Sequence, residues 1–334
     1  MDFLRNPAGD DGWDEFSIDR LDEEAREYLD RTGARQDLPI QRLEHMNEPA
    51  IDIYAENGID LRTEPLEIAV CSQHMNGGFA VNTWWESNIP RTFVVGEMAG
   101  THGVKRPGGS ALNAGQVGAA RAAEYIAQVY ASEPPPEDEA AAVAAKAVKD
   151  AYVLKTLLSS RNADAPTPQQ ILDDIGGRMT RSAAHLRSRP GVAEALEEAK
   201  ARYAALVDGG VQFDSVDRLP DAVLAIQQSF LQIAVLKAQA AMFDRGAGSR
   251  GSHCILDPAG EQMHPRLVDP ETGEPFRFAG ENEALRNEIL CLAYDPGAGD
   301  LFSTWLEDPR PIPEPDVPFE TAWAQYRRGD IYHA

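Results

Sequence analysis

The pattern of apolar and polar positions changes character along the chain. Residues 19–30 and 38–57 repeat apolar positions at helical spacing, which predicts two short amphipathic helices near the start. Between residues 66 and 97 the pattern changes to short apolar runs, LEIAV, FAVN and TFVVGE, separated by glycine and Asn-Ile-Pro turns. Short apolar runs bounded by turn residues are typical of strands. We therefore expect a helical segment over 1–65 and a segment of sheet within 66–132.

Long helical patterns dominate the middle of the chain. A glycine-led helix is expected from Gly109 to about Tyr130, and the run EPPPEDE then interrupts it, since three consecutive prolines cannot continue a helix. Thr167-Pro-Gln-Gln supplies an N-cap, a proline at the first helical position and a capping-box glutamine. Apolar positions recur at helical spacing over 140–158, 167–187, 192–207 and 219–243.

These elements predict an α+β fold. Its expected parts are a sheet segment, a helical bundle over 140–250 and a tail over 251–334 that wraps the bundle. The tail is punctuated by prolines, contains short strand-like runs and ends in an amphipathic turn around Trp323 and Tyr326.

Composition and charge narrow the class of protein. The chain has 334 residues, of which 43% are hydrophobic, so it can bury a sizeable core. Acidic residues outnumber basic ones by 54 to 31, giving a formal charge of -23 that opposes binding to nucleic acid. There is no run of eighteen apolar residues and no basic leader, so we expect a cytoplasmic protein that does not span a membrane. Cys71, Cys254 and Cys291 are widely spaced, which favours reduced thiols and no metal site.

The candidate chemistry is concentrated in Glu97–Gly118, which reads EMAGTHGVKRPGGSALNAGQVG. A helix that starts after Gly108-Gly109 exposes backbone N–H groups and a positive dipole end, which suit an anionic or electron-rich ring. Arg106 lies just before this helix and offers a planar fork suited to a carboxylate. His102 lies in the same turn, and Glu97 follows an expected strand, where a carboxylate can accept hydrogen bonds from sugar hydroxyls.

A second polar loop precedes this stretch. It reads CSQHMNGGFAVN and places His74 before the paired glycines Gly77 and Gly78. Each feature alone has a simpler explanation: a solvated glutamate, a tight glycine turn, a surface ion pair or a structural histidine. Two histidines, an arginine and a glycine-led helix start within one short span favour a site.

One apparent motif is rejected. Gly246-Ala-Gly-Ser-Arg-Gly251 matches G-x-G-x-x-G, but it follows a long expected helix and precedes an irregular segment. A dinucleotide-binding turn needs a strand before it and a helix after it. The match therefore does not predict pyrophosphate binding.

The two polar loops resemble a known family. CSQHMNGGFAVN, followed by Asn88–Ala127, resembles the second half of the FAD-binding domain in fumarate reductase and succinate dehydrogenase flavoproteins, a family that includes L-aspartate oxidases. Residues 239–253, which end in SRGSH, are similar to that family's helical domain. The resemblance implies FAD as cofactor. It also implies a capping-domain remnant over 1–65, and an incomplete FAD-binding sheet region followed by a helical domain and an irregular tail.

The resemblance also implies roles for particular residues. His74 and Arg106 match the family residues that hold a substrate carboxylate, and Glu97 matches the glutamate that contacts the ribityl or ribose part of FAD. His102 lies in a loop near the flavin. The turn glycines and the residues that open the next helix match cofactor-binding positions, namely Gly77, Gly78, Gly108, Gly109, Ser110, Ala111 and Leu112. Lys105 and Pro107 replace the family's usual asparagine and leucine, which leaves the substrate open.

The implied activity is hydride transfer between flavin N5 and a C=C or CH–CH bond beside a carboxylate of a small substrate. The family's pyrophosphate turn and its proton-donating arginine have no match here, and Arg5 is no substitute for the latter. We therefore expect the chain to need an N-terminal flavoprotein half or another redox subunit, and to be inactive alone. Two alternatives stay open: an inactive fragment, and an acidic helical interaction module with vestigial flavin motifs.

Overall fold

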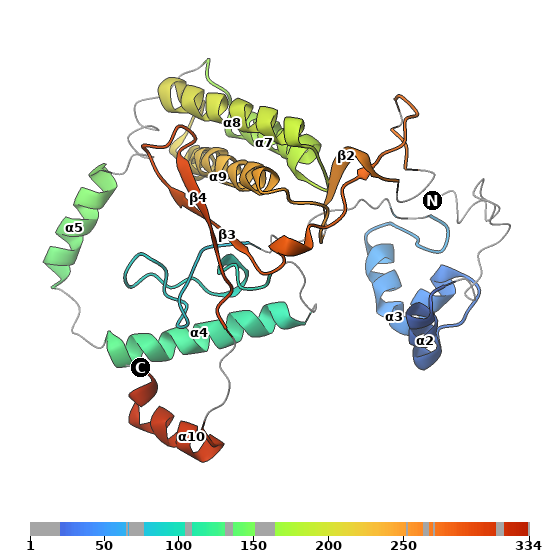
Figure 1. The fold of residues 1–334 in the computed structure, drawn as a ribbon, viewed down its shortest axis with the longest axis horizontal. Coiled ribbons are helices and arrows are strands. Elements are labelled where there is room, and N and C mark those ends of the chain that lie inside the picture. Colours follow the sequence, from blue (N-terminus) through green and yellow to red (C-terminus); the bar gives the residue numbers. More distant parts are fainter. Residues whose placement is uncertain are drawn as a thin grey trace. The chain divides into compact units, whose positions relative to one another are not determined.

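A computed structural model describes residues 21–64, 66, 77–103, 109–130, 136–150, 164–251, 253–262, 267–269, 271–311 and 317–332. The chain divides into two compact units, Met1–Cys71 and Ser72–Ala334. Its fold class is α+β, with long helices and small two-stranded sheets, as the sequence predicts (Figure 1).

The first unit contains the two helices expected near the start of the chain. Helix α2 spans Glu23–Thr32, and its N-cap Asp22 accepts a hydrogen bond from the Ala25 N–H at 2.8 Å. Helix α3 spans Pro39–Glu56 and is kinked at Asn47, two residues before Pro49. The kink follows from the proline, which removes a backbone donor and crowds the preceding turn.

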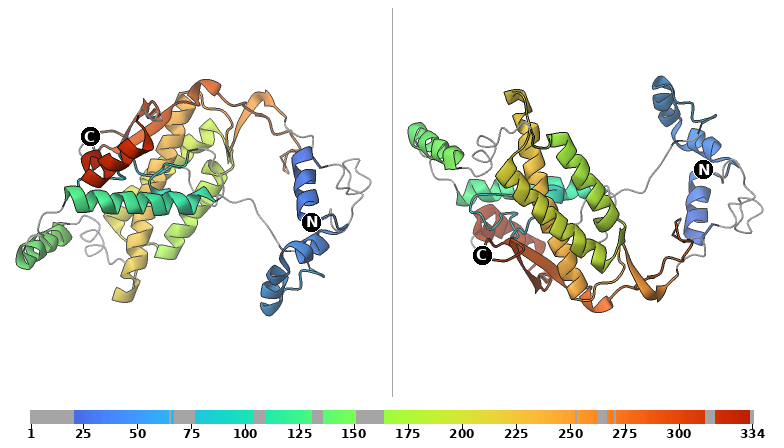
Figure 2. Two further views of the ribbon diagram at one scale, coloured as in Figure 1. Left: turned by 90° about the horizontal axis from the view of Figure 1, so that it is seen from below. Right: turned by 90° about the horizontal axis from the view of Figure 1, so that it is seen from above.

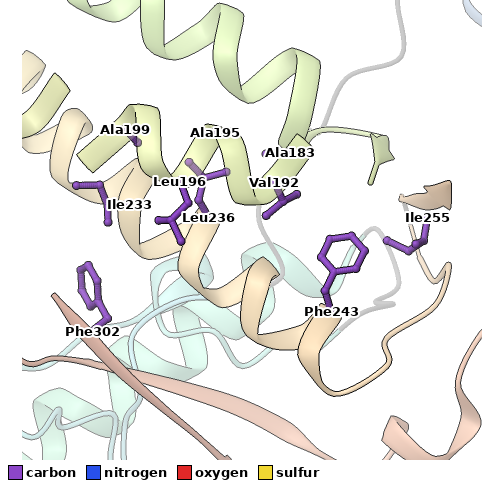
Figure 3. Packing of buried hydrophobic residues seen from close by; sticks show 10 residues of the cluster. All are labelled: Ala183, Val192, Ala195, Leu196, Ala199, Ile233, Leu236, Phe243, Ile255 and Phe302. Atoms are coloured by element: carbon purple, nitrogen blue, oxygen red, sulfur yellow. The ribbon is translucent and has the colours of Figure 1, made fainter. Parts of the chain in front are cut away.

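The second unit is built around three mutually contacting helices, α7 (Pro168–Ala183), α8 (Arg189–Gly209) and α9 (Leu219–Asp244). Two further views keep them side by side (Figure 2). The larger buried cluster contains the ten residues labelled in Figure 3: Ala183, Val192, Ala195, Leu196, Ala199, Ile233, Leu236, Phe243, Ile255 and Phe302. These helices confirm the prediction of helical segments over 167–187, 192–207 and 219–243.

Helix α9 is long and apolar enough to cross a membrane by length and composition. Its packing offers another explanation for that composition, because its buried residues face α7 and α8 and the hairpin of β3 (Ile289–Tyr294) and β4 (Phe302–Glu307). Core helices of globular proteins pass the same test, so this helix is weak support for a membrane span.

The start of α7 forms the predicted capping box. Thr167 Oγ1 accepts a hydrogen bond from the Gln170 N–H at 3.2 Å, and Gln170 Oε1 accepts one from the Thr167 N–H at 2.9 Å.

Replacing Thr167 with alanine is expected to lower the free energy of unfolding by about 1 kcal/mol. Urea denaturation followed by circular dichroism measures this loss. Gln169→Ala, at an exposed neighbour, should change stability by less than about 0.5 kcal/mol; equal losses would rule out the cap as the cause.

Two small sheets flank the bundle. Strand β1 (Leu186–Arg187) pairs in parallel with β2 (Cys254–Glu261), and β3 (Ile289–Tyr294) pairs antiparallel with β4 (Phe302–Glu307). Both β3 and β4 contact α9, and Phe302 from β4 enters the larger cluster (Figure 3).

The segment Gly246–Gly251 lies between α9 and β2, which is a helix–turn–strand setting. This setting confirms that its G-x-G-x-x-G match is no dinucleotide-binding turn. Gly248 has a packing role, since a Cβ at this position would lie 1.7 Å from the Gly280 carbonyl oxygen.

The expected strands at 79–82 and 92–97 are not formed. In the described part of this segment, pairing is limited to single bridges, Gly78 with Ala99 and Glu86 with Phe93. The chain reverses too tightly for a ladder, because Asn82 Oδ1 accepts hydrogen bonds from the N–H groups of both Trp84 and Glu86. The segment LEIAV lies outside the described residues except for Leu66.

The remaining elements are helices. They comprise the long α4 (Ser110–Val129), α5 (Glu137–Asp150), α10 (Phe319–Arg328) near the end of the chain, and the short 3-10 helices η2 (Gly96–Met98), η3 (Val216–Arg218), η4 (Glu283–Leu285) and η5 (Asp330–Tyr332). Helix α4 confirms the glycine-led helix, and α10 confirms the amphipathic turn around Trp323 and Tyr326. The η5 turn contacts α4.

Candidate flavin-facing site

Helix α4 begins without a side-chain cap. Gly109 is its N-cap residue. Leu112, in the first turn, keeps 79% of its surface exposed. Backbone N–H groups of a first helical turn have no partner within the helix, and the helix dipole makes this end positive. The amino end of α4 therefore suits an electron-rich group that approaches along the helix axis.

The loop that carries Gly77 and Gly78 folds back on the segment that carries Glu97. Phe79 donates its N–H to the Met98 carbonyl at 2.7 Å, next to the bridge between Gly78 and Ala99. A Cβ at Gly78 would lie 2.3 Å from the Met98 carbonyl oxygen and 2.5 Å from the Gly100 nitrogen. Only glycine permits this approach of two backbones.

The η2 turn attaches the same loop to α4. Gly96 adopts a φ of +71°, and a Cβ placed on it would lie 3.7 Å from the Gly115 Cα on α4. Glu97, the middle residue of η2, is exposed. Contacts between η2 and α4 thus hold Glu97 beside this helix.

An aromatic brace, formed by Trp84, Trp85, Tyr125 and Tyr332, fixes the loop along α4. Trp84 stacks on Tyr125 and also contacts Tyr332, with ring centroids 5.2 and 5.1 Å apart. The Arg121 guanidinium lies 4.4 Å from the Trp84 ring centroid, a cation–π distance. Trp85 lies against α4, where a Cβ at Gly118 would come within 2.7 Å of its indole nitrogen.

Glu124 on α4 links the brace to the end of the chain. It accepts hydrogen bonds from the hydroxyls of Tyr326 at 2.9 Å and Tyr332 at 3.0 Å. Burial, together with this hydrogen bond, raises the pKa of Tyr332 above its ordinary value. Both phenols therefore stay protonated donors at neutral pH, and the C-terminal turn stays attached to α4.

Sequence reasoning missed the brace. The small residues Gly115 and Gly118, spaced by three within α4, are the one local signal of close packing on that helix. The aromatic partners are distant in sequence, so no local pattern connects them.

The predicted site residues fall into two groups. Gly77, Gly78, Glu97 and His102 lie in the 77–103 loop, and His102 is half-buried there. Gly109, Ser110, Ala111 and Leu112 open α4, to which the loop is joined through η2. Three further predicted residues, His74, Arg106 and Gly108, lie outside the described residues. Among the described residues no three His, Cys, Asp or Glu side chains gather as a metal site.

No protein-family model matches the chain. It is 28% identical over 182 residues to one subunit of the fumarate reductase (CoM/CoB) of Methanothermobacter marburgensis, a match that covers 54% of this chain and 30% of that protein. It is 28% identical over 162 residues to an uncharacterized FAD-dependent oxidoreductase of Methanocaldococcus jannaschii, covering 48% of this chain and 29% of that protein. The chain thus matches under a third of these relatives' length.

Two further similarities are shorter or concern the fold alone. The chain is 35% identical over 83 residues to the L-aspartate oxidase of Bacillus subtilis, which covers 24% of this chain and 16% of that enzyme. A mutant FrdA chain of E. coli quinol fumarate reductase matches with a TM-score of 0.53 at 19% identity, covering 77% of this chain and 47% of that one. The last match shows a shared fold.

Proposed function

We propose that this chain forms the flavin-facing and carboxylate-facing part of an FAD-dependent oxidoreductase. The reason is its similarity to the fumarate reductase and succinate dehydrogenase-like flavoproteins. The observation that supports this most is the junction of the 77–103 loop with α4, which sets Glu97 beside a helix that begins without a side-chain cap. The reaction we assign is reduction of a C=C bond, or oxidation of a CH–CH bond, beside a carboxylate.

The described residues fit one edge of a flavin. The amino end of α4, which has no side-chain cap, would offer N–H groups and a positive dipole end to the electron-rich pyrimidine edge, a contribution of about 1 kcal/mol. Ser110, Ala111 and Leu112 would lie along this edge, and the exposed Glu97 would accept hydrogen bonds from the ribityl or ribose hydroxyls. FAD, when bound, supplies the hydride chemistry.

The substrate end of the site is assigned to Arg106 and His74, with His102 nearby. The guanidinium of Arg106 would hold a carboxylate with two parallel hydrogen bonds, and His74 would donate one more. This arrangement orients the substrate and selects a small carboxylate over a neutral compound.

The residues that bind the FAD pyrophosphate and the residue that donates the proton are assigned to another segment or chain. Within the described residues the single G-x-G-x-x-G match lies in a helix–turn–strand setting, so it cannot cradle a pyrophosphate. We propose that an N-terminal flavoprotein half or another redox subunit completes the site. We place the assembled enzyme in the cytoplasm, with α9 packed inside its bundle.

Reconstitution tests this assignment. The purified chain, titrated with FAD, is expected to bind weakly, while co-expression with the N-terminal half of a related flavoprotein is expected to yield a yellow complex. Flavin absorbance per mole of chain is the measurement. Stoichiometric flavin on the chain alone would contradict the need for a partner, and a colourless complex would contradict the flavin site itself.

Replacing Arg106 with lysine in the assembled enzyme is expected to lower kcat/KM for its carboxylate substrate by about tenfold, because lysine loses one of the two hydrogen bonds. The flavin content should stay unchanged. Arg202→Lys, at an exposed position on α8, serves as the control. Unchanged turnover in the Arg106 variant would remove this residue from the site.

A further inference from the structure

The described residues of the SRGSH segment, 249–251 and 253, lie in a tight turn. Ser249 Oγ accepts a hydrogen bond from the Ile255 N–H at 2.9 Å, and Gly251 adopts a φ of +61° that favours glycine. Arg250 and His253 exchange backbone hydrogen bonds across the turn at 3.1 and 3.3 Å. These hydrogen bonds hold the turn in place. The side chain of His253 makes no hydrogen bond within the described residues.

Strand pairing brings Arg187 to the same place. In the parallel pair of β1 with β2, Arg187 lies opposite Ile255. Side chains two residues apart in extended chain point to the same face, so His253 and Ile255 share the face of Arg187. Ile255 is buried, and both Arg187 and His253 are half-buried. The register thus sets an imidazole and a guanidinium at the edge of the core.

Among the residues that the structure describes, the charges at this place are not balanced. Arg250 is paired with Glu281 at 3.0 Å, and Glu281 is also bound by Arg286 at 2.8 Å. Arg187 donates its Nε–H to the Ala184 carbonyl at 2.7 Å, and no carboxylate among the described residues pairs with it. Burial lowers the pKa of Arg187, and burial with the charges of Arg187 and Arg250 lowers the pKa of His253 to about 4. Within the described part of the chain, one positive charge therefore remains without a counter-charge beside a neutral imidazole.

We propose that Arg187 and His253 form a binding site for a small carboxylate anion. The free guanidinium N–H groups of Arg187 match the two oxygens of a carboxylate, and a neutral imidazole can donate one more hydrogen bond. The single uncompensated charge fits a monoanion better than a doubly charged phosphate. This site uses residues outside the proposed flavin site, so the proposal is independent of the proposed function.

Formate is the probe, because it is the smallest carboxylate, and total formate is raised at the acidic end of the titration so that its ionised form stays saturating. The full chain is labelled at histidine Cε1, and the His253 resonance is assigned with His253→Gln. Saturating formate is expected to raise the apparent pKa of His253 by about 1 or more, since an anion favours the imidazolium. Formate should accordingly bind about tenfold more tightly to the protonated form, because the coupling is reciprocal.

Arg187→Gln is expected to abolish the formate response, while Arg181→Gln, at an exposed position on α7, should leave it unchanged. If Arg187→Gln fails to fold, Arg187→Lys keeps the charge without the fork and should weaken the response. The proposal is overturned if sodium chloride at equal ionic strength produces the same change. It is also overturned if the response survives in either Arg187 variant at full strength, or if His253 does not respond to formate.

Discussion

Replacing Arg178 with methionine is expected to lower the free energy of unfolding of the helical bundle by about 3 kcal/mol. Arg178 is 1% exposed, yet its guanidinium reaches all three helices of the bundle. On α7 it binds Asp174 at 2.5 Å, on α8 Glu198 at 3.0 Å, and on α9 the amide oxygen of Gln232 at 2.9 Å. Methionine fills similar space but leaves these acceptors without their donor.

The expected loss lies at the lower end of the range for a broken buried ion pair. Asp174 and Glu198 keep 41% and 44% of their side-chain surface exposed, so water can solvate them once the arginine is gone. Gln232 is 3% exposed and its amide oxygen would stay buried without a donor, which costs about 1–3 kcal/mol. The lost packing of the guanidinium and its stem adds the remainder.

Urea denaturation followed by far-ultraviolet circular dichroism measures the Arg178 effect. Arg181→Met is the matched control, because Arg181 is 67% exposed and only approaches the same Glu198 at 4.0 Å. This control should change stability by less than about 0.5 kcal/mol. Similar losses in both variants would mean that Arg178 holds the bundle no better than a surface arginine.

The helices of this protein could be predicted from the sequence because their signals are local. Apolar spacing, the Thr167 capping box and the paired glycines before Ser110 each act within a few residues. Arg178 shows the limit, since its surroundings in the sequence, DDIGGRMTR, look like an exposed helical face. Its burial depends on Glu198 and Gln232, which belong to other helices.

The strands of the 66–97 segment show a different limit. The runs FAVN and TFVVGE have strand composition, but a strand also needs a neighbour to share its hydrogen bonds. Among the described residues their partners are single positions within the same tight loop, so bridges and the η2 turn form instead. The strand propensity of these runs could be recognised from the sequence, but the absence of a partner strand could not.

The candidate site was predictable in its parts and not in its assembly. The glycine-led start of α4 and the exposed Glu97 follow from local sequence. The attachment of the loop through Gly96 and Gly115, and of the C-terminal turn through Tyr326 and Glu124, joins residues far apart in the chain. Such contacts depend on tertiary packing that no single segment encodes.

Gly78→Ala is expected to disrupt the loop that carries Glu97 and, through it, the flavin site of the assembled enzyme. The added Cβ would lie 2.3 Å from the Met98 carbonyl oxygen, well inside contact distance, so the backbones must separate. Overpacking against backbone costs about 2–3 kcal/mol. If flavin binding requires the closed loop, its affinity should fall by about 30- to 150-fold.

Gly77→Ala is the matched control for this change. Gly77 has no atom within 4 Å of its added Cβ and no positive φ, so the loop should keep its shape. Hydrogen exchange of the Phe79 amide reports on the loop in the chain alone, since this N–H is bonded to the Met98 carbonyl at 2.7 Å. The Gly78 variant should lose this protection, while circular dichroism of the bundle stays unchanged. Full protection of Phe79 together with normal flavin affinity would show that the close approach at Gly78 does not support the site.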